Sequence, residues 1–187
     1  RYARPDNILS LDSEDPIYDG ADNGSENADL CDKSGSRLGL PYFNYPGHPI
    51  ASQADGLLMT YAELEFLLAE AALKGWITGD VESHYRAGMQ AAMNYYNVDY
   101  EAFGWTDFDD FYNNSGVAYD MNNPIQIWEQ KWLALFFHGL EPYFEVRRWM
   151  AESDFDWESI PFISPTCQNV NDDQLPVRFP YPGEEQS

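Results

Sequence analysis

The chain has 187 residues, enough for one domain with a hydrophobic core, and carries 32 acidic against 10 basic side chains. The resulting net charge of −22 repels the phosphate backbone of nucleic acids and the headgroups of anionic lipids, so no nucleic-acid partner is expected. Aromatic residues make up 16% of the chain, too many for a disordered acidic segment. The longest uninterrupted apolar run, Trp132–Phe137, is far shorter than the ~20 residues that cross a bilayer.

Residues 1–56 and the Pro-rich tail, 153–187, predict irregular structure; the first is dominated by Asp, Asn, Gly and Ser, which favour turns. Within residues 1–56, the stretch Asp19–Asp29 (DGADNGSENAD) has the oxygen-rich composition of a calcium loop. It fails as an EF-hand, since Ala21 stands at the third ligand position and Leu30 where the bidentate Glu belongs. We therefore expect no cofactor and no metal site, and keep calcium bound in another geometry as an alternative.

Residues 57–98 predict a hairpin of two antiparallel helices. Thr60 and Glu63 form a capping box, in which the Thr oxygen accepts a first-turn N–H and the Glu side chain reaches back. Gly75 supplies the left-handed stop of the first helix, and Asp80 is the N-cap of the second.

The apolar faces of these two helices follow from residue spacing. The first should bury a stripe made of Tyr61, Leu64, Leu67, Leu68, Ala71 and Ala72. Phe66, Ala69 and Leu73 make its opposite side apolar too, so this helix should lie between neighbours. The second should bury Val81, Tyr85, Met89, Ala92 and Tyr96. Small residues such as Gly88 would let the pair approach closely.

Residues 99–122 have no helical stripe, many aromatic rings and five Asp, and predict an acidic aromatic loop. Residues 123–152 predict a second hairpin, in which Asn123 caps a helix that ends at Gly139 and Pro142 opens the next helix. Two hairpins with short turns predict an all-α fold of tetratricopeptide-like repeats with long irregular loops and few, short strands.

No motif typical of a catalytic or metal site occurs in the sequence: H-E-x-x-H, G-x-S-x-G, a P-loop and G-x-G-x-x-G are all absent. His48, His84 and His138 stand far apart, and we expect the last two to be structural side chains on helices. Cys31 and Cys167 match no metal or redox spacing, and whether they form a disulfide stays open.

Two carboxylates, Glu63 and Glu70, are seven residues apart and share a helical face, so they could serve a glycosidase as acid and base. The alternative assigns them structural roles: Glu63 caps its helix, and Glu70 is paired within the helical packing. We expect the structural roles and no catalytic residue.

The segment QKWLALFFHGLEPYFEVRRW (130–149) places Lys131, Arg147 and Arg148 among aromatic rings in a chain that is poor in bases. An Arg fork pairs carboxylates and stacks on rings, so Arg147 and Arg148 are expected to brace the two helices, with Glu145 and Arg148 as i,i+3 neighbours. A clamp for a substrate anion is the alternative.

Four segments in chain order carry a resemblance: MTYAELEFLLAEAALKGW, then YRAGMQAAMNYY, then QKWLALFFHGLEPYFEVRRW, and finally LPVRFPYPGEE. Together they resemble the SusD/RagB family, with small departures such as Pro142, where the family tends to have Ala. Each motif alone is weak, but four in order are specific.

The resemblance implies a right-handed superhelix of helical-hairpin repeats, of which this chain would be the C-terminal part. It further implies a non-catalytic, surface-exposed lipoprotein of the Bacteroidetes outer membrane that serves polysaccharide utilisation. Such proteins capture oligosaccharides, or in some branches peptides, for a SusC-type TonB-dependent transporter. They are lipid-anchored through an N-terminal Cys that is not present in this chain.

No binding residue carries over from the family, so the ligand site is predicted from chemistry. Sugar sites need flat rings for the apolar faces of pyranoses, with carboxylates or amides for their hydroxyls. The acidic loop offers such a set: Trp105, Asp107, Phe108, Asp109 and Tyr112. The alternative is that these rings only anchor the loop.

Two functions of other classes remain as rivals: an α-helical (α/α)-barrel glycoside hydrolase, and a tetratricopeptide-like scaffold that binds only protein. A hydrolase would place two carboxylates opposite each other in one aromatic cleft, whereas the SusD-like interpretation places Glu63 and Glu70 inside the repeat packing.

Overall fold

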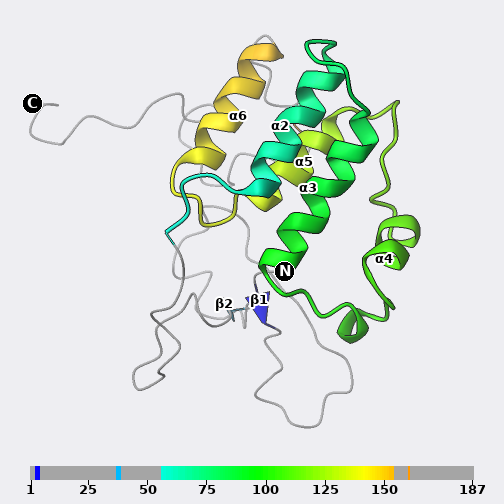
Figure 1. The fold of residues 1–187 in the computed structure, drawn as a ribbon. Coiled ribbons are helices and arrows are strands. Elements are labelled where there is room, and N and C mark those ends of the chain that lie inside the picture. Colours follow the sequence, from blue (N-terminus) through cyan, green and yellow to red (C-terminus); the bar gives the residue numbers. More distant parts are fainter. Residues whose placement is uncertain (1–2, 5–36, 39–55, 154–159, 161–187) are drawn as a thin grey trace, which may run out of the picture. The chain divides into compact units, whose positions relative to one another are not determined.

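The structure is a computed structural model that describes residues 3–4, 37–38, 56–153 and 160 (Figure 1). They fall into two compact units, one covering 56–145 and the other the remaining described residues. The helices, in chain order, are α2 (Tyr61–Leu73), α3 (Val81–Tyr95), the 3-10 turn η2 (Glu101–Phe103), α4 (Phe108–Asn114), α5 (Ile125–Ala134) and α6 (Glu141–Glu152).

Strands are few and short, as predicted. Within the described ranges, the only strands are β1 (Ala3–Arg4) and β2 (Arg37–Leu38), which pair antiparallel with Ala3 opposite Leu38. The remaining regular structure in those ranges is helical, which confirms the predicted fold class. None of the described helices is long and apolar enough to cross a membrane.

The ends of α2 are those that the sequence predicts. The Thr60 Oγ1 accepts the N–H of Glu63 at 3.2 Å, which is the first half of the capping box. Gly75 has a φ of +70°, and the N–H groups of Gly75 and Trp76 donate to the carbonyls of Ala72 and Ala71. This pair of backbone hydrogen bonds is the Schellman motif, which a Gly in the left-handed conformation permits.

The buried face of α2 differs from the predicted stripe. Ala62, Phe66 and Ala69 are the buried apolar residues, whereas Tyr61 and Leu64 are 62% and 41% exposed. The sequence could not rank the two faces, because both are apolar. The structure selects the Phe66 face since α3 and α5 both pack there.

Helix α3 lies against α2 as the second arm of the hairpin (Figure 1). Asp80 caps it as predicted, accepting the Ser83 N–H at 3.0 Å. The predicted close approach occurs at Gly88, where an added Cβ would lie 3.0 Å from the ring of Phe66. That ring also meets the Tyr85 ring of α3 edge to face, with ring centroids 6.1 Å apart. The two helices pack closely because the Phe66 ring lies against Gly88, which has no side chain.

The segment 99–122 is not a plain loop. It contains η2 and α4, whose N-cap is Asp107, with Asp109 and Asp110 in the first turn. Acidic residues at a helix N-terminus satisfy its free N–H groups and complement its dipole. The aspartates that make the segment look like a loop are therefore what starts the helix.

Helix α5 ends at Ala134, not at Gly139 as predicted, and the Asn123 side chain makes no capping bond at its start. Phe137 adopts a φ of +66°, and Gly139 one of +62°, so the chain leaves the helix before the Gly. Left-handed backbone at a bulky residue such as Phe137 has no sequence signature. Leu135 is still fully buried, although it lies beyond the helix.

Several predicted features lie outside the described residues. These are the loops of 1–56 apart from β1 and β2, most of the tail, the calcium-like stretch Asp19–Asp29, His48 and the two cysteines, Cys31 and Cys167.

Replacing Phe66 by Ala should lower the free energy of unfolding by about 3–5 kcal/mol, because a fully buried ring is lost from the contact with Gly88. Leu64→Ala, on the exposed face of the same helix, is the matched control and should cost less than about 1 kcal/mol. Urea unfolding followed by circular dichroism measures both. Equal losses would contradict this assignment, because they would show that the Leu64 face meets the core as well.

Candidate functional site

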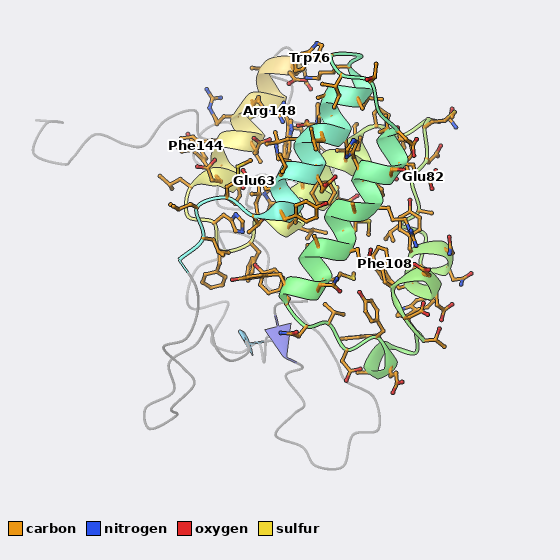
Figure 2. The ribbon with its side chains drawn as sticks, in the orientation of Figure 1. Glu63, Trp76, Glu82, Phe108, Phe144 and Arg148 are labelled. Carbon is orange, nitrogen blue, oxygen red and sulfur yellow. The ribbon has the colours of Figure 1, made fainter. Side chains whose placement is uncertain are left out.

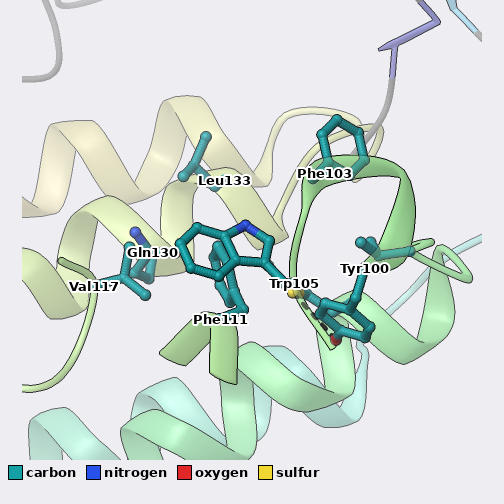
Figure 3. Close-up of a pocket in the computed structure, with 9 residues that line it drawn as sticks. Tyr100, Phe103, Trp105, Phe111, Val117, Gln130 and Leu133 are labelled. Carbon is teal, nitrogen blue, oxygen red and sulfur yellow. Dashed lines mark hydrogen bonds between the residues drawn. The ribbon is translucent and has the colours of Figure 1, made fainter. Parts of the chain in front are cut away.

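A pocket of about 310 Å³ opens between the segment after α3 and helix α5 (Figure 3). We call it the Trp105 pocket. It is lined by Met93, Val98, Tyr100, Phe103, Trp105, Phe111, Val117, Gln130 and Leu133. A pocket of this size, with apolar walls and a few polar groups, has the character of a small-molecule site.

The indole of Trp105 forms the centre of this pocket, between the side chains of Phe103 and Gln130 in the view of Figure 3. It is half-buried and meets Phe111 edge to face, with ring centroids 6.0 Å apart. Phe103 is 43% exposed. The Trp105 pocket therefore offers aromatic rings that stay accessible from outside.

The backbone around Trp105 is fixed by local bonds. The N–H of Trp105 donates to the carbonyl of Tyr100 at 3.0 Å, and Gly104, with a φ of +80°, makes the reversal that this bond needs. On the other side, the carboxylate of Asp110 accepts the backbone N–H of Thr106 at 2.9 Å. That bond, with the amide of Asn114, lowers the pKa of Asp110 below its usual value. The ring is thus presented by a fixed turn.

Of the five residues predicted to bind ligand, only Trp105 lines the Trp105 pocket. Phe108 and Tyr112 are buried in the core, 5% and 2% exposed, with the Arg86 guanidinium 5.5 Å from the centre of each ring. Asp109 pairs with Arg86, and Asp107 is the N-cap of α4. Phe108, Asp109 and Tyr112 thus attach α4 to α3, as in the anchoring alternative that the sequence left open, while Asp107 caps α4 itself.

Tyr112 shows how tightly this attachment is made. Its hydroxyl donates to Glu82 of α3 at 3.3 Å and accepts the N–H of Tyr119 at 3.0 Å. Burial raises its pKa, so the phenol stays protonated and can donate. Figure 2 shows Phe108 on α4, the short helix beside α3.

The sequence did not identify the other eight lining residues as part of a ligand site. Tyr100, Phe103 and Phe111 lie in the predicted segment but were not singled out, and Gln130 and Leu133 come from α5. The aromatic content of 99–122 was the signal for the first three. Nothing in a single sequence places α5 against that segment, because this contact is set by tertiary packing.

A buried ion cluster links α5 to α2 and to Glu145 of α6, all within residues 56–145. The ammonium of Lys131 on α5 is fully buried, and it lies 2.8 Å from Glu145 at the start of α6 and 3.6 Å from Glu70 on α2. Glu70 is therefore paired inside the helical packing, as the structural interpretation expects. The basic residue with full burial in this unit is Lys131, whereas Arg148 is a third exposed and pairs with Glu152 one turn on.

Glu63 lies near a second buried group, the imidazole of His138, which follows α5 in a turn and not on a helix. The His138 Nδ1 and the Glu63 Oε2 are 3.8 Å apart, and neither has a hydrogen-bond partner among the described residues. Burial raises the pKa of Glu63, against the opposing effect of Lys131, and burial lowers the pKa of His138. Both shifts favour the uncharged forms.

His84 is a structural histidine, as predicted. Its Nδ1 lies 2.7 Å from a carboxylate oxygen of Glu65, which joins α3 to α2. Among the residues that the structure describes, no group of three or more His, Cys, Asp or Glu side chains could hold a metal ion.

Comparison with known proteins gives one family and one solved structure. The sequence profile of a SusD-like family, described as starch-binding and associating with the outer membrane, matches residues 10–182. The crystal structure of a SusD homolog from Bacteroides fragilis matches with a TM-score of 0.71 and 24% identity. The match covers 99% of this chain and 42% of that protein, so the chain spans less than half of its length. No curated protein matches the sequence.

Replacing Lys131 by Met should lower the free energy of unfolding by about 3–5 kcal/mol, because Glu70 and Glu145 lose their buried counter-charge. Glu152→Gln, which breaks the more exposed pair with Arg148, should cost less than about 1 kcal/mol. Chemical denaturation measures both variants. The double variant K131M/E70Q should recover part of the loss, and an unchanged stability in K131M would show that the cluster does not hold the helices.

The lowered pKa of His138 predicts a pH effect on stability. The folded protein resists protonating this imidazole, so the unfolded chain binds more protons and stability falls as the pH drops below about 6.5. Glu63, with its raised pKa, contributes in the opposite direction, and Glu141 opposes the shift of His138. Thermal unfolding at pH 7.5 and 5.5 should show a smaller acid loss in His138→Gln than in the parent protein. An equal or larger loss would contradict a His138 that is held neutral.

Proposed function

The chain belongs to the SusD-like family of starch-binding, outer-membrane-associated proteins, and from that premise we propose that it is a non-catalytic nutrient-binding protein. It would capture an oligosaccharide at the cell surface and deliver it to a SusC-type TonB-dependent transporter. Attachment to the outer face of the outer membrane through a lipidated N-terminal Cys of the full-length protein is part of the same proposal.

The observation that carries the proposal is the Trp105 pocket. An accessible indole in an uncharged pocket can stack on the apolar C–H face of a pyranose ring. The amide of Gln130 is the polar group that can bond a sugar hydroxyl from the α5 side. In a family described as starch-binding, such a pocket is best interpreted as a saccharide site.

The positions of Glu63 and Glu70, the two carboxylates that a hydrolase could have used, favour capture over hydrolysis. Glu63 and Glu70 are 9% and 5% exposed, and neither lines the Trp105 pocket. A glycosidase needs its acid and its second carboxylate on either side of the bond in one cleft. Their burial away from that pocket supports the proposal that both residues have structural roles.

The segment around the pocket supports one alternative ligand. Residues 99–122 carry six acidic side chains and no Lys or Arg. A field of this sign attracts cations, so a basic peptide with an aromatic or apolar side chain is the second candidate. Calcium bound by Asp19–Asp29, outside the described residues, also remains a proposal.

Trp105→Ala should weaken binding of maltoheptaose and soluble starch at least about tenfold, equivalent to ~1.4 kcal/mol, because the stacking surface is removed. Trp76→Ala is the matched control: Trp76 is 74% exposed at the turn between α2 and α3, away from α4 (Figure 2), and its loss should leave affinity unchanged. Isothermal titration calorimetry with the full-length protein measures both.

Two further arms separate the rivals. A basic peptide panel in the same titration tests the alternative ligand, and chromatography of the glycans after long incubation tests for cleavage. Cleavage that disappears in Glu63→Gln or Glu70→Gln would overturn the capture proposal in favour of a hydrolase. Binding that is equal in the Trp105→Ala and Trp76→Ala proteins would remove the Trp105 pocket as its site.

A further inference from the structure

A second cavity, of about 420 Å³, lies where the start of α2, the end of α3 and the chain after α5 meet. We call it the tyrosine cavity. Its walls include three rings, from Tyr61, Tyr95 and Tyr96. It shares no lining residue with the Trp105 pocket, and it is larger. Of the residues described above for the candidate site, only His138 lines it.

Small side chains create the room in this cavity. The alanines at its walls come from three different elements and are Ala62, Ala91, Ala92 and Ala134. Three of them are nearly fully buried, whereas Ala91 is half-buried. An alanine at each of these positions leaves a ring-sized space that a Leu or Met would fill.

The rings around that space are accessible and held in place. Tyr61 and Tyr95 are 62% and 36% exposed. Tyr96 meets Tyr95 edge to face at 4.9 Å, and its hydroxyl donates to the carbonyl of Phe136 at 3.0 Å. The ring of Tyr96 is therefore fixed, while the two others present surface to solvent.

The polar groups of the cavity are all uncharged. Thr60 and Asn94 contribute a hydroxyl and an amide, and His138 contributes an imidazole whose side chain is 1% exposed. In a chain in which 22% of residues are charged, none of the ten lining residues is Asp, Glu, Lys or Arg. An ionic ligand would find no counter-charge on these walls, so the lining favours a neutral ligand.

The chemistry of the lining groups restricts the class of ligand further. Accessible tyrosine rings pack against an apolar face, and amide, hydroxyl and imidazole groups bond hydroxyls that project from it. A pyranose ring has both features, and a cavity of about 420 Å³ is within the usual range for small ligands.

We propose that the tyrosine cavity is a second saccharide site, which takes a neutral pyranose unit independently of the Trp105 pocket. The inference rests on the proposed capture function and adds a second place of contact to it. Met93 lines the Trp105 pocket, and the three residues that follow it, Asn94, Tyr95 and Tyr96, line the tyrosine cavity. The end of α3 therefore contributes to both. One protein molecule would thus bind two sugar units, one in each cavity.

The alanines provide a selective test, since four line the tyrosine cavity and none lines the Trp105 pocket. The full-length protein, labelled at alanine and methionine methyl groups, is titrated separately with maltotriose, xylotriose, cellotriose and mannotriose in NMR experiments. At least one trisaccharide should shift the methyl signals of Ala91 and Ala92, and these shifts should persist in Trp105→Ala.

Three variants address the cavity directly. Tyr95→Ala removes an exposed ring and should weaken the alanine-detected binding at least tenfold, while Tyr95→Phe should retain most of it. Ala91→Leu fills the space at a half-buried position and should abolish that binding. In all three, the signal of the Met93 methyl should still report binding at the Trp105 pocket, which also shows that the protein is folded.

The outcomes separate the two proposals. Shifts at Met93 without shifts at the alanines would overturn the second site and leave the capture function standing. Binding of benzyl alcohol at the alanines, with none of the four trisaccharides, would overturn the assignment of a saccharide to this cavity. No response at either place to any trisaccharide would contradict both proposals.

Discussion

The buried ammonium of Lys131 is the interaction on which the arrangement of this unit depends. It pairs with Glu145 at the start of α6 and lies near Glu70 on α2, so it fixes the rotation of α5 between them. Neighbouring residues of α5 then face different ways: Gln130 and Leu133 line the Trp105 pocket, and Ala134 lines the tyrosine cavity. A buried charge is costly unless it is paired, so other rotations of α5 are excluded strongly. The rotation of α5 that Lys131 fixes thus determines which α5 residues line each cavity.

The aromatic residues divide into those that hold the structure and those that remain accessible. Tyr85 packs against Tyr112 and Tyr119, and its hydroxyl donates to the carbonyl of Val117 at 2.9 Å. These contacts attach the segment after α3 to the helical hairpin. Trp105 and Phe103 lie on the same segment without entering that core. The buried rings hold the segment on the hairpin, and local hydrogen bonds fix the turn at Trp105, so the high aromatic content serves both purposes.

Sequence patterns identified local features well and tertiary choices poorly. Caps and stops depend on a few neighbouring residues, and Thr60, Asp80 and Gly75 behave as predicted, whereas Asn123 and Gly139 do not. The predicted buried face of α2 was wrong because both faces are apolar, and the packing of α3 and α5 selects the Phe66 face. Within the predicted ligand set, Trp105 could be distinguished from Phe108 only with the structure, in which the Arg86 guanidinium lies over the Phe108 ring. The fold could be predicted from the family motifs because four of them occur in order along the chain.

The distribution of charge explains how so acidic a chain can bind a neutral ligand. In 99–122, carboxylates cap helix starts, as Asp107 does, or pair with Arg86, as Asp109 does, while the lining of both cavities is uncharged. Stacking and hydrogen bonds to neutral groups are screened little by salt, unlike contacts between exposed charges. For the capture function proposed here, affinity would then depend on the shape of the sugar ring, and the surface charge would not set the specificity.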